Sequence, residues 1–427
     1  MIYLSTKPKS RRVFSQSERN LEQRSVPPHV VLFLIYNALY FVPLIVSFML
    51  GPRLVDVGDL LSIPPKTIGE IFVIYIIGIC AFLVGSDWRR LLGRPIGKRS
   101  YTLTNLRKVR FDTASKLLVI LFCVIFCISK ILIIPLGVYS SYGVGAEFMS
   151  GSMWSFSIIC SELLVVLSIV ALFSADKYNV RWFIFLLALN GINLLHGTRF
   201  FFIIGCFVGI VYAYTRRLIR FRSIIAIGLP AFFAVLILSY SVFLHRSHAS
   251  SDSQQAMAAS VFSPLIFESV FSQISLINTL TMPGILSFTG HAFDFLSSLI
   301  TINIPRFLIP DKDTLFHPSV DLTSLSPLGA FNGYAYGLIA FGVCFPLYYL
   351  LCGMVADWLY KMSRLSSLWT IIYIYFTAGF MFRTMRDGYV IPIKLLGNVL
   401  EFIAVAIWLH WLLSAQQTQR PAMGRNQ

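Results

Sequence analysis

The chain has 427 residues, of which 56% are hydrophobic and 13% are charged, and its mean hydropathy is +0.74. The apolar residues gather into blocks of roughly 20 residues, the length of a bilayer-spanning helix, which excludes a soluble globular protein, a disordered chain, a disulfide scaffold and a β-barrel. The net charge of +16 does not indicate a nucleic-acid partner, because Lys and Arg cluster between the apolar blocks, where a cytoplasmic membrane face needs them.

Basic or polar tails flank a series of apolar blocks. Residues 1–28 carry a basic tail and residues 414–427 a Gln- and Arg-rich one, and we expect both to be cytoplasmic arms beside an anionic leaflet. The blocks between them predict membrane-spanning helices. They lie near residues 29–50, 68–86, 115–135, 154–174, 182–214, 223–244, 332–355, 367–382 and 389–413. All seven cysteines fall inside these blocks, which predicts packing positions rather than disulfides or a metal site.

The block at 182–214 decides the topology. As one helix it would be about 50 Å long, more than a bilayer core of ~30 Å, and His196-Gly197-Thr198-Arg199 interrupts its middle. We therefore predict two short helices joined by a turn. This gives about ten spans with both termini in the cytoplasm, and about 25 of the 35 Lys and Arg residues on the inner side. A single tilted helix would instead place the basic cluster at 216–222 outside.

One long outer segment separates the first seven predicted helices, within 29–244, from the last three, within 332–413. It covers residues 245–331 and is the only sizeable region outside the predicted membrane. Its stretch 261–282 has apolar residues at helical spacing, but polar residues interrupt it, so we expect an interfacial or re-entrant amphipathic helix. A second short helix is expected at 292–302.

Several cations fall near the outer face in this topology, although Lys and Arg usually lie on the cytoplasmic side. Their position therefore calls for a structural or functional explanation. They are Arg199, Arg246, Arg306, Lys312, Arg383, Arg386 and Lys394. Guanidinium groups there suit the phosphate or pyrophosphate head of a lipid carrier, because Arg binds oxyanions bidentately and keeps its charge. Arg199 stands out, because Gly197 permits a tight turn and the next helix N-terminus offers N–H donors. The alternative for each Arg is snorkelling to lipid phosphates or pairing with a neighbouring acid, and for 383–388 it is a solvated turn between two spans.

Few charges are predicted at mid-membrane, where Lys130 and Glu401 are the exceptions, and this favours an enzyme over a transporter. The sequence lacks a phosphate-binding GxxxxGK[ST] loop, a dinucleotide fingerprint, an HExxH pair and a CxxC pair. We therefore predict no nucleotide-driven transport, no metal and no cofactor.

Three sequences carry a resemblance to a known family: Gly197-Thr198-Arg199, the loop end Ile304-Pro305-Arg306-Phe307-Leu308-Ile309-Pro310-Asp311-Lys312, and the run Asn332-Gly333-Tyr334-Ala335-Tyr336-Gly337-Leu338-Ile339-Ala340-Phe341-Gly342. They resemble the Wzy-type O-antigen and exopolysaccharide repeat-unit polymerases, whose multi-span plan is also similar. An Arg-x10-Gly pattern of some members occurs here on the outer side only as Arg386 with Gly397.

The resemblance implies an all-α, multi-pass protein of the bacterial inner membrane, with a GT-C-like fold and an active site that faces the periplasm. It implies transfer of the growing glycan from undecaprenyl pyrophosphate to a new lipid-linked repeat unit. Expected partners are undecaprenyl-pyrophosphate-linked oligosaccharides, membrane lipids and a chain-length-determinant co-polymerase, with no nucleic acid.

The residue roles follow from this chemistry. The cations expected to stabilise the leaving pyrophosphate are Arg199, Arg306 and Arg386, with Lys312 and Arg383 as second choices. Residues expected to bind pyrophosphate or glycan also include Gly197, Thr198, Arg246 and Tyr336. Unranked candidates for a general base are His317, Asp313, Asp387 and Asp294. An O-antigen ligase and a transporter of polyprenyl-linked or anionic solutes stay open as alternatives.

Overall fold

The computed structural model describes the helices of one bundle. It covers residues 27–50, 65–91, 113–133, 152–173, 179–195, 200–215, 263–282, 331–363 and 365–387, together with 237, 292, 293, 297 and 397. Every regular element within these ranges is a helix, as the sequence predicts. The predicted spans 223–244 and 389–413, both tails, and most of the long outer segment lie outside the described residues.

The first four predicted spans are helices, and each begins within about three residues of its predicted start. They are α2 (Pro28–Leu50), α3 (Pro65–Leu91), α4 (Thr113–Ile133) and α6 (Ser152–Leu172). Proline occupies the first position of α2 and of α3, where its missing N–H would have no partner within the helix and its fixed φ suits a helix start.

The predicted division of the block at 182–214 is confirmed. The elements are α7 (Asn179–Asn190), the short α8 (Ile192–Leu195) and α9 (Phe200–Thr215). Gly205 of α9 lies against Leu187 of α7, and Gly209 lies against Phe183. The contacts move forward along α9 as they move backward along α7, so the two helices are antiparallel. The chain reverses direction between them, although how often it crosses a membrane stays a prediction.

The predicted span at 332–355 is longer than expected and is bent. It consists of α16 (Gly333–Phe341), a 3-10 turn η3 (Gly342–Cys344) and α17 (Phe345–Met362). Gly342 has φ 53° and ψ −130°, a backbone conformation that an L side chain rarely adopts. This glycine therefore permits the bend between the two α-helical parts.

The helices α3 and α17 cross at very short range. A Cβ atom at Gly85 would meet the backbone carbonyl oxygen of Leu350, and one at Gly353 would meet the carbonyl oxygen of Phe82. Small residues at a helix crossing let the two backbones approach closely, which increases van der Waals contact where the hydrophobic effect cannot drive association.

We expect Gly85→Ala to lower the free energy of unfolding by about 1–3 kcal/mol, because the new methyl group meets backbone that cannot rotate away. Gly69→Ala, on the same helix, is the matched control, because no atom lies within 4 Å of the position of its Cβ. Unfolding of the purified protein by SDS in mixed micelles measures both. Equal stability of the two variants would contradict the close crossing.

The last described helical segment extends further than the sequence predicts. It comprises α18 (Ser367–Tyr375), a π-helix η4 (Phe376–Phe380) and α19 (Met381–Asp387). The expected connection at 383–388 is therefore wrong for residues 383–387, which are helical. The sequence prediction ended the span where charges begin, but a helix can continue past that point when its charges are paired inside the protein.

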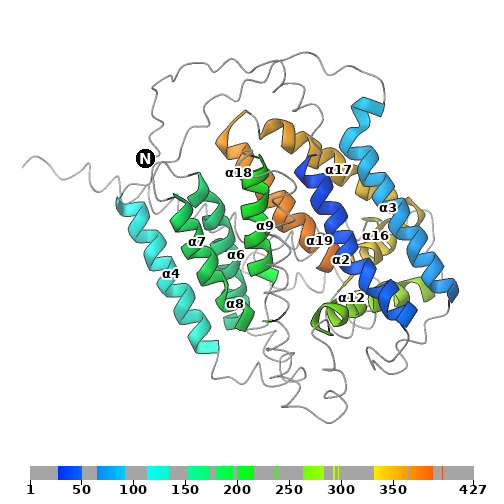
Figure 1. The fold of residues 1–427 in the computed structure, drawn as a ribbon, viewed down its shortest axis with the longest axis horizontal. Helices are drawn as coiled ribbons and strands as arrows, with labels where there is room; N and C mark the ends of the chain where they lie inside the picture. The colour runs from blue at the N-terminus through cyan, green and yellow to red at the C-terminus, as the bar shows by residue number, and fades with distance from the viewer. Residues whose placement is uncertain are drawn as a thin grey trace, which may run out of the picture.

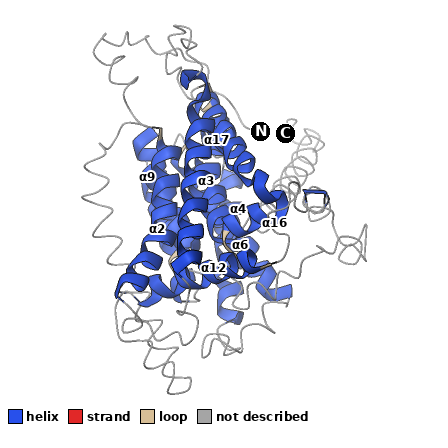
Figure 2. Ribbon diagram, turned by 90° about the vertical axis from the view of Figure 1, so that its right-hand side faces the viewer, coloured by secondary structure: helices blue, strands red, loops and turns tan. Residues whose placement is uncertain are grey.

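The helix predicted at 261–282 is present as α12 (Ser263–Thr281). Five consecutive residues, 272–276, are buried, so this part of the helix is enclosed on all sides. It contacts α2, α3 and α16 and lies at one end of the bundle in both Figure 1 and Figure 2. Enclosure by protein fits the re-entrant alternative for this half of the helix and does not fit a helix that lies in a bilayer surface.

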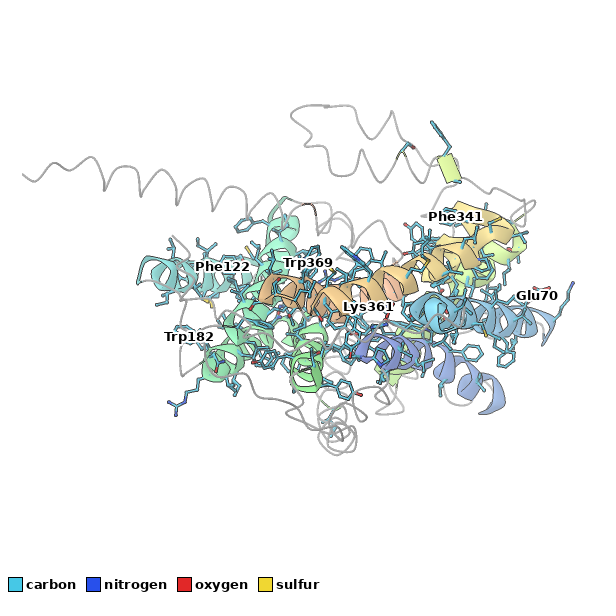
Figure 3. The ribbon with its side chains drawn as sticks, turned by 90° about the horizontal axis from the view of Figure 1, so that it is seen from above. Glu70, Phe122, Trp182, Phe341, Lys361 and Trp369 are labelled. Carbon is cyan, nitrogen blue, oxygen red and sulfur yellow. The ribbon has the colours of Figure 1, made fainter. Side chains whose placement is uncertain are left out.

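The described helices form an elongated array. Figure 3 shows α4, which carries Phe122, at one end and α3, which carries Glu70, at the other. Large apolar side chains are exposed along the outside, including Ile120, Leu121, Val124 and Ile128 of α4, and Phe72, Val73, Ile76 and Ile77 of α3. Polar side chains are buried between the helices, among them Ser161, Asn190, Asn193, Gln273 and Asn332. This distribution suits an apolar surrounding better than water.

Two described helices are long and apolar enough to cross a membrane, at Lys66–Ser86 and Gly333–Met362. Five shorter apolar helices accompany them, at Pro28–Val42, Val119–Ile131, Phe156–Leu172, Asn179–Asn190 and Phe200–Thr215. The fold is therefore compatible with a helical membrane protein.

Candidate functional site

A buried ion pair joins two helices in the interior of the bundle. Arg383 of α19 donates from Nη2 to Oε2 of Glu162, which stands near the middle of α6, and both side chains are fully buried. The hydroxyl of Tyr375, at the end of α18, donates to the other carboxylate oxygen of Glu162. Each carboxylate oxygen thus accepts a hydrogen bond, as a buried charge requires.

Two aromatic rings at the start of α9 lie close to the arginines. The guanidinium carbon of Arg383 lies 5.0 Å from the ring centre of Phe201 and 5.5 Å from that of Phe200. The guanidinium carbon of Arg386 lies 5.0 Å from the ring centre of Phe200. These distances are within the range of cation–π attraction. Residues from α6, α9, α18 and α19 therefore meet at one cationic cluster, made of Glu162, Tyr375, Arg383, Arg386 and Phe200.

The π-helix η4 explains how Tyr375 and Arg383 both reach Glu162. Their positions in the chain differ by eight. In a regular α-helix this spacing would point the two side chains about 80° apart around the helix axis. A π-helical turn accommodates one extra residue, so the effective separation is seven α-helical residues, or about 20°. Within 376–380, the carbonyl oxygen of Thr377 also accepts a 3.1 Å hydrogen bond from the Tyr36 hydroxyl of α2.

The beginning of α16 also packs against α19. Asn332 caps the helix: its side-chain oxygen accepts a 2.8 Å bond from the N–H of Tyr334. A Cβ at Gly333 would meet the carbonyl oxygen of Thr384, so only glycine allows this approach. The run from Asn332 to Gly337, which carries part of the family resemblance, therefore lies directly beside the helix that bears both arginines.

A second buried polar network anchors α12 at the same helix start. The Asn332 amide donates to the Tyr75 hydroxyl over 3.0 Å, and the Gln273 amide donates to that hydroxyl over 2.6 Å. The Asn332 N–H donates to the Ser275 hydroxyl over 2.8 Å. This network holds α12, a part of the predicted outer segment, against α3 and α16.

A further network connects α6 with the helix hairpin. The Ser161 hydroxyl donates to the Asn193 side-chain oxygen over 3.1 Å, and the Asn193 amide donates to the Asn190 oxygen over 2.6 Å. The Asn190 amide donates to the carbonyl oxygen of Phe201 over 3.1 Å. Ser161 directly precedes Glu162, so one turn of α6 holds both the ion pair and the start of α9.

The structure describes three of the predicted site residues with their side chains, and it brings two of them together. Arg383 and Arg386 share the cationic cluster, whereas Tyr336 of α16 is buried with its ring centre 4.3 Å from that of Phe331. Asp387 is the last described residue of α19, and its side chain is not described. The other predicted residues lie outside the described part: Gly197, Thr198, Arg199, Arg246, Asp294, Arg306, Lys312, Asp313 and His317.

Sequence reasoning missed Glu162, which is buried near the middle of α6. Glu162 is the single acidic residue of α6, surrounded in sequence by apolar and small residues. A lone carboxylate inside an apolar span is a signal for a functional or paired site. Arg383 gives a similar sequence signal, because this charged residue directly follows an apolar run.

Among the described residues, no group of three or more His, Cys, Asp or Glu side chains could hold a metal ion. Metal independence stays a prediction. Comparison with protein families, with curated proteins and with solved structures finds no match to this chain. Its function is therefore inferred from its residues and their packing.

Proposed function

We propose that the chain is a multi-pass protein of the bacterial inner membrane with about ten spans and both termini in the cytoplasm. The exposed apolar side chains of α3 and α4 and the buried polar networks support this placement. The antiparallel pair of α7 and α9 supports the topology, because the proposed inward placement of the basic cluster at 216–222 needs the chain to reverse between these two helices. In this topology the ends of α9 and α19 that carry Phe200 and Arg386 lie toward the periplasm.

The proposed activity is polymerisation of lipid-linked oligosaccharide repeat units, either of O-antigen or of exopolysaccharide. The observation that carries it is the convergence of Arg383 and Arg386 on Phe200, the residue that follows Gly197-Thr198-Arg199 in the sequence. Two segments that carry outward cations, more than 180 residues apart, thus meet at one place. Clustered guanidinium groups suit a pyrophosphate, whose oxygens accept paired hydrogen bonds.

In the proposed reaction, a sugar hydroxyl of a new lipid-linked repeat unit attacks the anomeric carbon of the growing glycan. A glycosidic C–O bond forms, the bond from the anomeric carbon to the lipid pyrophosphate breaks, and a base takes the hydroxyl proton. Negative charge grows on the leaving pyrophosphate, and Arg386 with Arg199 and Arg306 would stabilise it. Asp294, Asp313, His317 and Asp387 remain the candidates for the base. An outer loop that excludes water would favour transfer over hydrolysis.

One observation favours a second candidate function. The pair of Glu162 and Arg383 places charge within the bundle, as transporters of anionic or polyprenyl-linked solutes do near the bilayer midplane. An O-antigen ligase is a third candidate, because it would use the same lipid-linked donor and similar cations. Deletion of the gene separates the polymerase from the other two functions by the product that is left.

The test is a deletion strain complemented with the wild-type chain or with Arg386→Ala, its surface polysaccharide separated on a gel with protein level controlled. We expect the deletion to leave a single repeat unit on the lipopolysaccharide core, or no polymer in an exopolysaccharide strain. Arg386→Ala should reproduce this pattern, because one lost donor lowers transfer by about 100-fold. Arg181→Ala, an exposed arginine of α7, is the control and should restore the full ladder.

Complete loss of repeat units from the core in the deletion would indicate a ligase or a transporter instead. A normal ladder in the deletion strain would refute any role in glycan assembly.

A further inference from the structure

Asn332 lies where three helices meet, and it is fully buried. Its side-chain oxygen accepts from the N–H of Tyr334, and its amide donates to the hydroxyls of Tyr75 of α3 and Ser272 of α12, over 3.0 Å and 3.4 Å. Its backbone N–H donates to the hydroxyl of Ser275, about one turn further along α12. Because both ends of the side chain and the N–H have partners, Asn332 fixes α3, α12 and the start of α16 to one another.

The next residue, Gly333, brings this junction into contact with α19. It packs so closely that a Cβ atom there would meet the carbonyl oxygen of Thr384 and the Cα atom of Met385. These two residues lie between Arg383 and Arg386 in the sequence. The backbone that carries both arginines is therefore held by the start of α16, in addition to the ion pair that holds it to α6.

We infer that Asn332 is a positioning residue that couples the seating of α12 to the position of α19, and through α19 to glycan transfer. The last step of this inference rests on the proposed function, in which the cationic cluster acts on the lipid pyrophosphate. Asn332 acts through α19 and not by contact with the substrate. The coupling links the predicted outer segment, to which α12 belongs, with the helix that carries the arginines.

The packing at Gly333 explains why a small shift would be transmitted. A glycine that touches backbone has no flexible side chain between the two helices, so a displacement of the start of α16 has to displace α19 or open a void. Loss of the acceptor for the Asn332 N–H would leave a buried donor unpaired. An unpaired donor of this kind favours local opening by about tenfold or more.

The first experiment is hydrogen exchange, followed by mass spectrometry, on the purified full chain in detergent. Ser275→Ala removes the acceptor of the Asn332 N–H, and we expect the amides of 381–387 in α19 to exchange about tenfold faster. Thr279→Val is the matched control, because this buried hydroxyl donates within α12, to the carbonyl oxygen of Ser275 over 2.7 Å. It should leave exchange at 381–387 unchanged. Unchanged exchange in Ser275→Ala, or equal acceleration in both variants, would overturn the coupling.

The second experiment measures transfer by the same variants, reconstituted with an undecaprenyl-pyrophosphate-linked repeat unit as substrate. Ser275→Ala is expected to lower kcat about tenfold with little change in KM for the acceptor, because α12 acts on the arginines and not on acceptor binding. Thr279→Val should keep the wild-type kcat. A rise in KM at an unchanged kcat would contradict the positioning role.

Tyr75→Phe provides a second variant if Ser275→Ala fails to fold. It keeps the ring and removes only the hydroxyl that receives the Asn332 and Gln273 amides. We expect faster exchange at 381–387 and a kcat lowered about threefold, since the Asn332 N–H keeps its bond to Ser275.

The two hypotheses fail in different ways. If Arg386→Ala transfers glycan at the wild-type rate, the proposed function of the cluster is wrong, whereas faster exchange in Ser275→Ala would still establish the coupling of α12 to α19. If Arg386→Ala is slow but Ser275→Ala and Tyr75→Phe keep the wild-type kcat, the proposed function stands and the positioning role is refuted.

Discussion

Arg383→Ala is expected to lower the free energy of unfolding by about 3–5 kcal/mol. The substitution leaves the Glu162 carboxylate buried without its cation, although the Tyr375 hydroxyl still donates to it. It also removes the stacking on Phe201. Unfolding of the purified protein by SDS in mixed micelles measures the change.

Removal of the whole polar group should behave differently. Glu162→Leu, Tyr375→Phe and Arg383→Met together replace the buried charges and the hydroxyl by apolar side chains, which is often neutral or stabilising by about 1–4 kcal/mol. The triple variant should therefore be at least as stable as the wild type and yet fail to form polymer. A triple variant as unstable as Arg383→Ala would show that the loss comes from packing rather than from an unpaired charge.

Much of the fold could be predicted because the signals that define it are local. Blocks of apolar residues mark α2, α3, α4 and α6, since a helix must satisfy its own backbone wherever water is absent. The reversal between α7 and α9 could be predicted too, because Gly197 and a run of polar residues interrupt a block too long for one span.

The cationic cluster could be predicted only in part, because its members come from distant segments. The sequence indicates that Arg383 and Arg386 are unusually placed cations. It does not indicate the partner of Arg383, because Glu162 lies 221 residues earlier in the chain. Which helices become neighbours depends on packing at positions such as Gly85 and Gly333, and a single sequence does not state these pairings.

The extent of α19 shows a second limit. Charge density predicts that a span ends before Arg383, and this is wrong because Glu162 and the rings of Phe200 and Phe201 replace the hydration that the guanidinium loses. The π-helix before it leaves no clear sequence signal, since the run Phe376 to Phe380 has the composition of an ordinary apolar helix.

Insertion of one Ala between Phe380 and Met381 is expected to separate Arg383 from Glu162. Tyr375 and Arg383 are then nine positions apart, and with one residue accommodated in the π-helical turn their effective separation is eight α-helical residues, or about 80°. Arg383 then turns away from α6 while Tyr375 stays in place, so both charges lose their partner. We expect a loss of stability at least as large as for Arg383→Ala, about 3–5 kcal/mol, together with loss of polymer.

The control for this insertion restores the residue count by deleting Ala378 in the chain that carries the inserted Ala. Tyr375 and Arg383 are then again eight positions apart, and the extra residue can be accommodated in a π-helical turn at a shifted position. Recovery of stability and of polymer would show that the rotation of α19 is what matters. Wild-type stability of the insertion alone would mean that the contact between Arg383 and Glu162 does not depend on the helical phase of α19, and the explanation of the cluster by the π-helix would be wrong.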